Sequence, residues 1–138
     1  MIHFETTLKV RYYECDPMGI VHHSNYLRYF ECARDEMISA WGYGIEQCQA
    51  DGITFPLVKA ELQFHRPAVS GDVIRVVAEI STVPLAKLVV NQQIFNQKGE
   101  LCCEGIVTLG FLSAVTGRPT RCPEKLLALM EAADSKYW

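Results

Sequence analysis

The stretch "NYLRYFECARDEMISAW" (residues 25–41) decides the fold. Its apolar side chains recur at steps of three and four residues, which places them on one side of a helix. They are Tyr26, Tyr29, Phe30, Ala33, Met37, Ile38, Ala40 and Trp41. Arg28, Glu31 and Asp35 fall largely outside this stripe. Because the stripe is broad, we predict one amphipathic helix that is well buried.

The residues around this helix mark its ends. Ser24 or Asn25 can cap the first amide groups with a side-chain oxygen. Gly42 and Gly44 favour termination, since glycine adopts the left-handed conformation that follows many helices. Residues 45–51 are then expected to form a short second helix, and residues 123–133 a third.

Beyond Gly52 the apolar period changes from about 3.6 residues to about two, which indicates strands. In residues 57–65, Val58, Ala60, Leu62 and Phe64 alternate with polar residues and predict one face in the core. Residues 96–100, "NQKGE", predict a hairpin turn built around Gly99. The predicted strands cover residues 3–12, 57–65, 73–80, 87–95 and 101–115.

The order of these elements predicts an α+β architecture, with one antiparallel sheet wrapped around one long central helix. The four strands after the helix follow one another at hairpin spacing, and hairpins join antiparallel strands. Residues 1–138 are expected to form a single domain. The 73–80 strand is apolar on both faces, which favours a second layer supplied by another copy of the chain.

Composition narrows the classes of function. Lys and Arg number 13 and Asp and Glu 16, for a net charge of −3, which argues against a nucleic-acid partner. Six cysteines lack C-x-x-C spacing, so we predict reduced thiols and no zinc site. The N-terminus lacks the layout of a signal peptide, and no apolar run approaches the roughly 20 residues of a membrane span. We expect a soluble cytoplasmic protein.

The loop "YYECDPMGIVHHSNY" (residues 12–26) places a carboxylate and two histidines ahead of the helix. Asp16, followed by Pro17, is a candidate general base or nucleophile, although Asp-Pro pairs are also common turn formers. The free amides at the start of the helix are candidate donors to an oxyanion. Adjacent His22 and His23 are poorly spaced to share one metal ion, so no metal is expected.

Residues 12–37, and most specifically their D-P-M-G-I-V-x-H-x-N-Y core, resemble the hot-dog-fold acyl-CoA thioesterases of the 4-hydroxybenzoyl-CoA thioesterase type. The stretches "FPLVKAELQFHRPAVSGDVI" and "NQKGELCCEGIVTLGFL" extend the similarity over nearly the whole chain. The resemblance implies that Asp16 is the catalytic carboxylate, as nucleophile or as general base. It implies that the backbone N–H of His23 polarises the thioester carbonyl.

Further site residues are expected around this pair. The substrate-binding candidates are Pro17, Gly19, His22, Asn25, Tyr26 and Lys87. Gly19 would let the backbone turn close to the ligand, and His22 would be a wall residue. Asn25 is equally a candidate cap and Tyr26 a candidate core residue. Lys87 is the first choice for contacting the coenzyme A phosphates, ahead of Arg118, Arg121, His65 and Arg66.

Two points stay open at this level. Other hot-dog thioesterases carry the carboxylate on the long helix, where this chain offers Glu31. The function expected first is hydrolysis of an aromatic or short-to-medium-chain acyl-CoA, without a cofactor. A hot-dog dehydratase acting on hydroxyacyl thioesters and a non-catalytic acyl-thioester binder are alternatives. The resemblance also implies a homotetramer built as a dimer of dimers.

Overall fold

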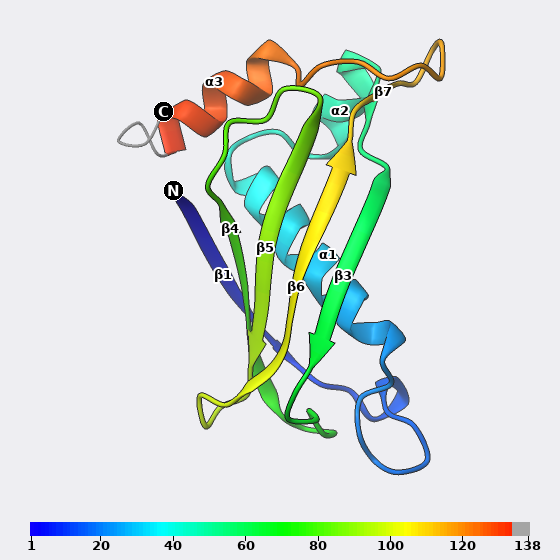
Figure 1. Cartoon of the computed structure of the whole chain (residues 1–138), viewed down its shortest axis with the longest axis vertical. Helices are drawn as coiled ribbons and strands as arrows, with labels where there is room; N and C mark the ends of the chain where they lie inside the picture. The colour runs from blue at the N-terminus through cyan, green and yellow to red at the C-terminus, as the bar shows by residue number, and fades with distance from the viewer. Residues whose placement is uncertain (134–138) are drawn as a thin grey trace.

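The computed structural model describes residues 1–133 and contains a five-stranded antiparallel sheet that wraps around the helix α1 (Ser24–Ala40) (Figure 1). The strand order is β1-β4-β5-β6-β3. The strands are β1 (Ile2–Lys9), β3 (Leu57–Phe64), β4 (Val73–Ile80), β5 (Lys87–Phe95) and β6 (Leu101–Gly110). The predicted α+β architecture is therefore confirmed.

Smaller elements complete the chain. The 3-10 turn η1 (Tyr12–Glu14) follows β1, and α2 (Ile45–Asp51) follows α1. The short strands β2 (Ile53–Thr54) and β7 (Leu112–Ser113) pair with each other beside the main sheet. The helix α3 (Glu124–Ala133) ends the described part of the chain. Both predicted short helices are confirmed, whereas the predicted 3–12 strand ends early and the 101–115 strand divides in two.

The expected hairpin between β3 and β4 does not form. β3 pairs with β6 instead, at the far edge of the sheet. The reason lies in the connection between β3 and β4, whose backbone bonds to other segments. Ala68 O accepts from Val21 N at 2.8 Å, and Asp72 O accepts from Val10 N at 2.8 Å. This connection holds the loop before α1 and is not a tight turn.

The edge position also explains a second difference from expectation. Val58 and Phe64 were predicted to face the core, yet they are 52% and 53% exposed. Since β3 has a neighbour on one side only, part of its apolar face lies open. Ala60 and Leu62, in the middle of β3, are half-buried as the alternation predicts.

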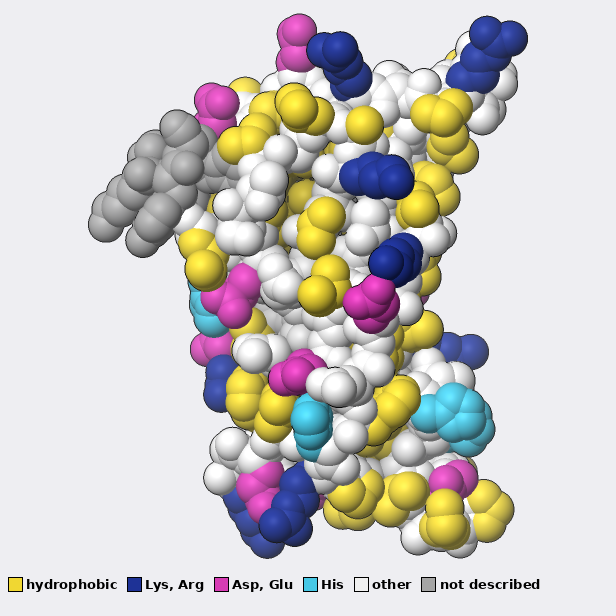
Figure 2. All heavy atoms as spheres, viewed as in Figure 1, with side chains coloured by type: hydrophobic (Ala, Val, Ile, Leu, Met, Phe, Trp, Pro, Cys, Tyr) yellow, Lys and Arg dark blue, Asp and Glu magenta, His cyan; other side chains and the backbone are white. Residues whose placement is uncertain are grey.

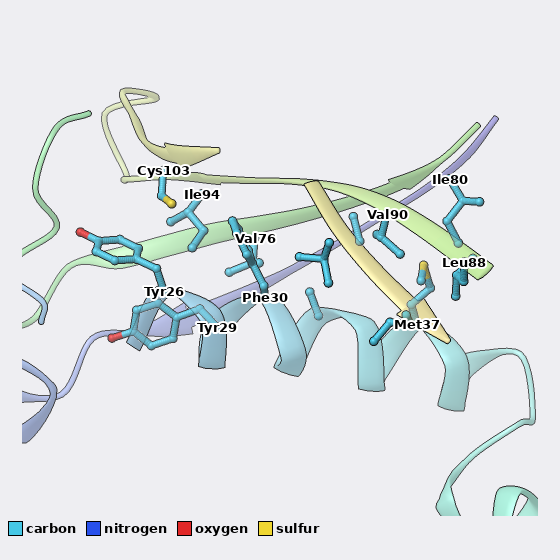
Figure 3. Close-up of a cluster of buried hydrophobic side chains, with 14 of the residues drawn as sticks. Tyr26, Tyr29, Phe30, Met37, Val76, Ile80, Leu88, Val90, Ile94 and Cys103 are labelled. Carbon is cyan, nitrogen blue, oxygen red and sulfur yellow. The ribbon is translucent and has the colours of Figure 1, made fainter. Parts of the chain in front are cut away.

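The core lies between α1 and the inner face of the sheet (Figure 3). Phe30, Ala33 and Met37 of α1 are fully buried, as the helical stripe predicts. Phe30 packs on Gly105 of β6, where an added Cβ would lie 3.0 Å from the Phe30 ring and 2.8 Å from Glu61 O. Glycine at position 105 therefore permits the close approach of the helix to the sheet.

We call the packed contact between α1 and the inner face of the sheet the seam. One polar connection crosses it. Gln92 of β5 is 1% exposed, and its side-chain amide donates to Phe30 O at 3.0 Å. Arg34 Nη1 donates in turn to Gln92 Oε1 at 2.9 Å. Burial lowers the pKa of the Arg34 guanidinium, although the nearby Glu31 carboxylate opposes that effect. The seam thus joins helix and sheet by directional bonds as well as by packing.

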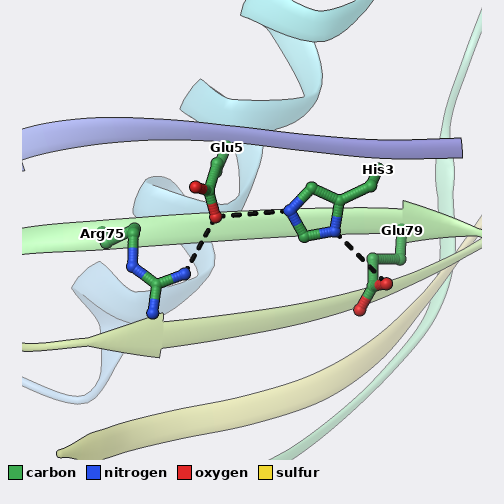
Figure 4. A network of polar contacts seen from close by, with 4 residues as sticks. All are labelled: His3, Glu5, Arg75 and Glu79. Atoms are coloured by element: carbon green, nitrogen blue, oxygen red, sulfur yellow. Dashed lines mark hydrogen bonds and ion pairs between the residues drawn. The ribbon is translucent and has the colours of Figure 1, made fainter. Parts of the chain in front are cut away.

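The outer face of β1 and β4 carries a ladder of charged side chains (Figure 4). Glu5 Oε2 lies 2.8 Å from Arg75 Nη1 and 3.3 Å from His3 Nε2, and His3 Nδ1 lies 3.3 Å from Glu79 Oε2. Val77 on the same face is 2% exposed and so is already covered within one chain. Val77 therefore does not support the second layer that we expected from its strand.

The wider outer surface mixes apolar, acidic and basic side chains without a dominant sign of charge (Figure 2). Val89 of β5 and Ile106 of β6 are 40% and 44% exposed there. Within residues 1–133, no helix combines the length and the hydrophobicity needed to cross a membrane.

Candidate active site

The loop that carries Asp16 is a tight turn built by its own sequence. Gly19 N donates to Asp16 O at 2.9 Å, and Asp16 Oδ1 accepts from Met18 N at 2.8 Å. Pro17 occupies the second position of the turn, where its fixed φ is favourable. Gly19 has a φ of 82°, which other residues rarely adopt. The turn explains why these residue types occur in this order.

The two arms of the loop are bonded to each other, and the returning arm is anchored to the β3–β4 connection. Cys15 bridges to Val21 on the return path, and Ile20 bridges to Val69 in the β3–β4 connection. His22 N donates to Glu14 O at 2.9 Å. The Asp16 carboxylate therefore stands on a loop that is fixed on both sides.

Asp16 and His23 line one hollow of about 380 Å³ between the loop, the start of α1 and the end of β3. The other lining residues are Met18, Ile20, Val21, Tyr26, Phe64, His65, Arg66, Pro67 and Cys102. The structure thus brings together five of the residues singled out in the sequence, namely Asp16, His23, Tyr26, His65 and Arg66. Tyr26 is 4% exposed, and its hydroxyl accepts from Ala68 N at 3.2 Å, so it is both wall and core.

Burial raises the pKa of Tyr26, although the bond from Ala68 opposes that effect. The phenol is therefore protonated at neutral pH and is a hydrogen-bonding wall residue. The ring lies 5.4 Å from that of Phe64, centroid to centroid, which links the helix to the open edge of β3.

The backbone N–H of His23 is a free donor at the start of α1. The neighbouring amides are occupied: His22 N donates to Glu14 O, Ser24 N to His22 Nδ1 and Asn25 N to His22 O. Within residues 1–133, His23 N makes no hydrogen bond. A free N–H at a helix start favours developing negative charge, through its own dipole and that of the helix.

Neither Ser24 nor Asn25 caps α1 with its side chain, contrary to the sequence prediction. Asn25 is 8% exposed, and its Nδ2 donates to Glu14 O at 2.7 Å, away from the hollow. The side chain of His22 accepts from Ser24 N and does not line the hollow.

The structure does not bring Lys87 to this hollow. Phe64 is level with Cys103 and Ile94 across the sheet, whereas Lys87 is level with Gly110 at the opposite end. The seven residue steps from Lys87 to Ile94 span about 23 Å.

Arg118 lies near that opposite end, since its carbonyl accepts from Ser113 N in β7. His65 and Arg66 are the basic residues on the lining. They face Glu104 at 3.8 Å and Glu100 at 3.2 Å, respectively.

Glu14 is a structural residue of the site that sequence reasoning missed. Its carboxylate accepts from Tyr29 Oη at 3.0 Å and from Arg11 N at 2.8 Å, while its carbonyl accepts from His22 N and Asn25 Nδ2. Burial, followed by the Glu14 bond, raises the pKa of Tyr29 far above its usual range. The i,i+3 spacing of Arg11 and Glu14 was the available signal.

Glu31, the rival carboxylate, lies outside the hollow of Asp16. It is exposed on α1 and lines a separate groove with Arg34, Phe55 and Leu109. Among residues 1–133, no three His, Cys, Asp or Glu side chains gather to hold a metal ion.

Comparison with known proteins places the chain in a family. A family sequence model described as the thioesterase-like superfamily matches residues 10–130. The chain therefore belongs to this superfamily, and its sheet wrapped around one helix is the hot-dog fold.

Individual relatives agree with this assignment. The acyl-CoA thioester hydrolase YbgC of Escherichia coli is 26% identical over 125 residues, covering 91% of this chain and 93% of that protein. The DHNA-CoA thioesterase structure from Staphylococcus aureus is 29% identical, with a TM-score of 0.87, covering 99% of this chain and 91% of that one. A hypothetical protein from Thermus thermophilus is 31% identical, with a TM-score of 0.86, covering 94% and 98%.

Proposed function

We propose that this protein hydrolyses acyl-CoA thioesters to the free acid and coenzyme A. The observation that carries the proposal is that Asp16 and His23 line the same hollow, and that the His23 N–H makes no hydrogen bond within residues 1–133. The names of the similar YbgC and DHNA-CoA proteins support the class of reaction. The acyl group is aromatic or a short-to-medium aliphatic chain, as the family resemblance implies.

In this mechanism the thioester carbonyl oxygen accepts from His23 N–H, which stabilises the negative charge that develops as the carbon becomes tetrahedral. Met18 N–H holds Asp16 Oδ1 and orients the carboxylate. Asp16 then acts in one of two ways. It attacks the carbon, expels the coenzyme A thiolate and forms an anhydride that water hydrolyses, or it removes a proton from an attacking water.

The open edge of β3 supports assembly into dimers, and the family resemblance extends this to a homotetramer in the cytoplasm. Val58 and Phe64 are half-exposed on β3, and an unpaired strand is a template for pairing with another chain. In antiparallel pairing about a twofold axis, the Phe64 end of one strand lies beside the partner strand's opposite end. Lys87 would then contact coenzyme A only from a neighbouring copy.

The test is thiol release from a panel of aromatic and aliphatic acyl-CoAs by the wild type, Asp16→Asn and Asp16→Ala. We expect turnover to fall roughly a thousandfold or more in both variants, while binding of the thioester persists. Glu31→Gln is the matched control, because Glu31 is an exposed carboxylate outside the hollow.

If the Asp16 variants keep their turnover and Glu31→Gln loses it, the catalytic carboxylate is Glu31 of α1 and not Asp16. Wild-type protein that binds acyl-CoA but releases no thiol would favour the non-catalytic binder. Dehydration of a hydroxyacyl thioester without thiol release would favour the dehydratase.

A further inference from the structure

The imidazole of His22 has an unusual position at the start of α1. Its Nδ1 lies 2.8 Å from Ser24 Oγ and accepts from the backbone N–H of Ser24 at 3.2 Å. A backbone N–H can only donate, so Nδ1 presents a lone pair and the ring proton is on Nε2. The ring thus supplies an acceptor for the first backbone amide of α1, one of the amides that have no partner within a helix.

His22 holds the first turn of α1 through three of its atoms. Its N–H donates to Glu14 O at 2.9 Å, its carbonyl accepts from Asn25 N at 2.9 Å, and its Nδ1 accepts from Ser24 N. The His23 N–H lies between amides that are all fixed in this way. The His22 ring also stacks on the His23 ring, with centroids 4.0 Å apart.

We propose that His22 is a positioning residue, whose neutral imidazole caps α1 and so aims the His23 N–H at the thioester oxygen. The inference rests on the proposed function, and it gives His22 a different role from the wall residue expected from the sequence. Its side chain does not line the hollow of Asp16. An oxyanion donor must be held in place before the reaction, so a residue that orders it acts on kcat more than on KM.

Three substitutions separate the acceptor atom from the bulk of the ring. His22→Ala removes both, His22→Phe keeps an aromatic ring without an acceptor, and His22→Asn restores an acceptor on a shorter side chain. We expect kcat to fall between about tenfold and about a hundredfold in His22→Ala and His22→Phe. The fall should be no larger than that caused by complete removal of an oxyanion donor, because the His23 N–H is still present in both variants. KM should change by less than about threefold, since ground-state contacts are retained. His22→Asn should recover most of the lost kcat.

Two outcomes overturn the proposal. A rise in KM with unchanged kcat in the Ala and Phe variants would make His22 a wall of the binding site. Failure of His22→Asn to exceed His22→Ala, with all variants folded by circular dichroism, would exclude the capping role.

A measurement that needs no turnover keeps this inference separate from the proposed function. Long-range ¹⁵N–¹H correlation of the histidine rings, at a pH where imidazole is neutral, reports which nitrogen carries the proton. We expect His22 to be protonated on Nε2 and the ¹⁵N–¹H signal of the His23 amide to shift in His22→Ala. A proton on Nδ1 would exclude the cap even if the enzyme is an active thioesterase. If the wild type hydrolyses no acyl-CoA but the ring has the expected tautomer, only the proposed function fails.

Discussion

The start of α1 and its middle differ in the exposure of their side chains and in their hydrogen bonding. At the start of the helix, His22, His23 and Ser24 are exposed, and the His23 N–H has no hydrogen-bond partner within residues 1–133. About two turns further on, Phe30 and Ala33 are completely buried against the sheet. The contrast teaches that one helix separates stability from chemistry along its length. Packing in the seam supports the helix, and the start of the helix presents the His23 N–H that we propose as the oxyanion donor.

The largest expected effect of a single change tests the seam. Phe30→Ala removes a ring that is 0% exposed and packs on Gly105. We expect the free energy of unfolding to fall by about 3–5 kcal/mol, measured by urea denaturation. Activity per folded molecule should stay close to that of the wild type, because Phe30 does not line the hollow. A large loss of kcat in fully folded Phe30→Ala would show that seam and site are not separate.

Gly105→Ala tests the same seam from the side of the sheet. The new Cβ would lie 2.8 Å from Glu61 O, and backbone cannot move aside easily. We expect a loss of about 1–3 kcal/mol, from overpacking and not from a cavity. Gly110→Ala on the same strand is the control, because its nearest neighbour is a methyl group of the half-exposed Val58 at 3.2 Å. Equal losses in the two variants would contradict a special contact at Gly105.

The polar connection of the seam should cost less to remove. Gln92→Leu leaves Arg34 without its acceptor and Phe30 O without its second donor, at an expected cost of about 1–2 kcal/mol. The double variant with Arg34→Leu should lose less than the sum of the two single variants, because the unpaired guanidinium is then gone. Additive losses in this double-mutant cycle would mean that the two side chains act independently.

The sequence predicts the seam well because its signal is periodic. Phe30, Ala33 and Met37 recur at helical spacing. The pairing of β3 with β6 was not predictable in this way. It depends on Val21 N bonding to Ala68 O, a contact between two loops that no local pattern encodes.

The site divides along a similar line. The approach of Asp16 and His23 follows from the eight residues 16–23 of one loop, and the family resemblance pointed to it. The role of Glu14 was not predicted, because its bonds with His22, Asn25 and Tyr29 join residues 8–15 positions apart. Two of these bonds are made by its backbone carbonyl, which no side-chain pattern reveals. The distance of Lys87 from the Asp16 loop could have been predicted from the order of the strands. Successive antiparallel strands reverse direction, so β3 and β5 run the same way. The start of β5 must therefore lie at the other end of the sheet from the end of β3.

The smallest expected effect concerns the charged ladder on the outer face, which belongs neither to the seam nor to the site. The hydrogen bond from Arg75, and then that with His3, lowers the pKa of Glu5, while partial burial opposes the shift. A carboxyl whose pKa is lower in the folded protein contributes stability above its unfolded pKa of about 4.3. That contribution is lost as the pH falls through the folded pKa.

The size of this contribution follows from exposure. The Glu5 and Arg75 side chains are each 43% exposed, so water and salt screen the pair, and we expect less than about 0.5 kcal/mol. Glu5→Gln should be less stable than the wild type at neutral pH, and the difference should vanish once the pH is below the folded pKa of Glu5 and shrink in about 1 M salt. The measurement is urea unfolding of both proteins across this pH range. A difference that persists in acid would have to come from packing of the Glu5 stem against β4, because a protonated Glu5 no longer carries the charge that Arg75 attracts.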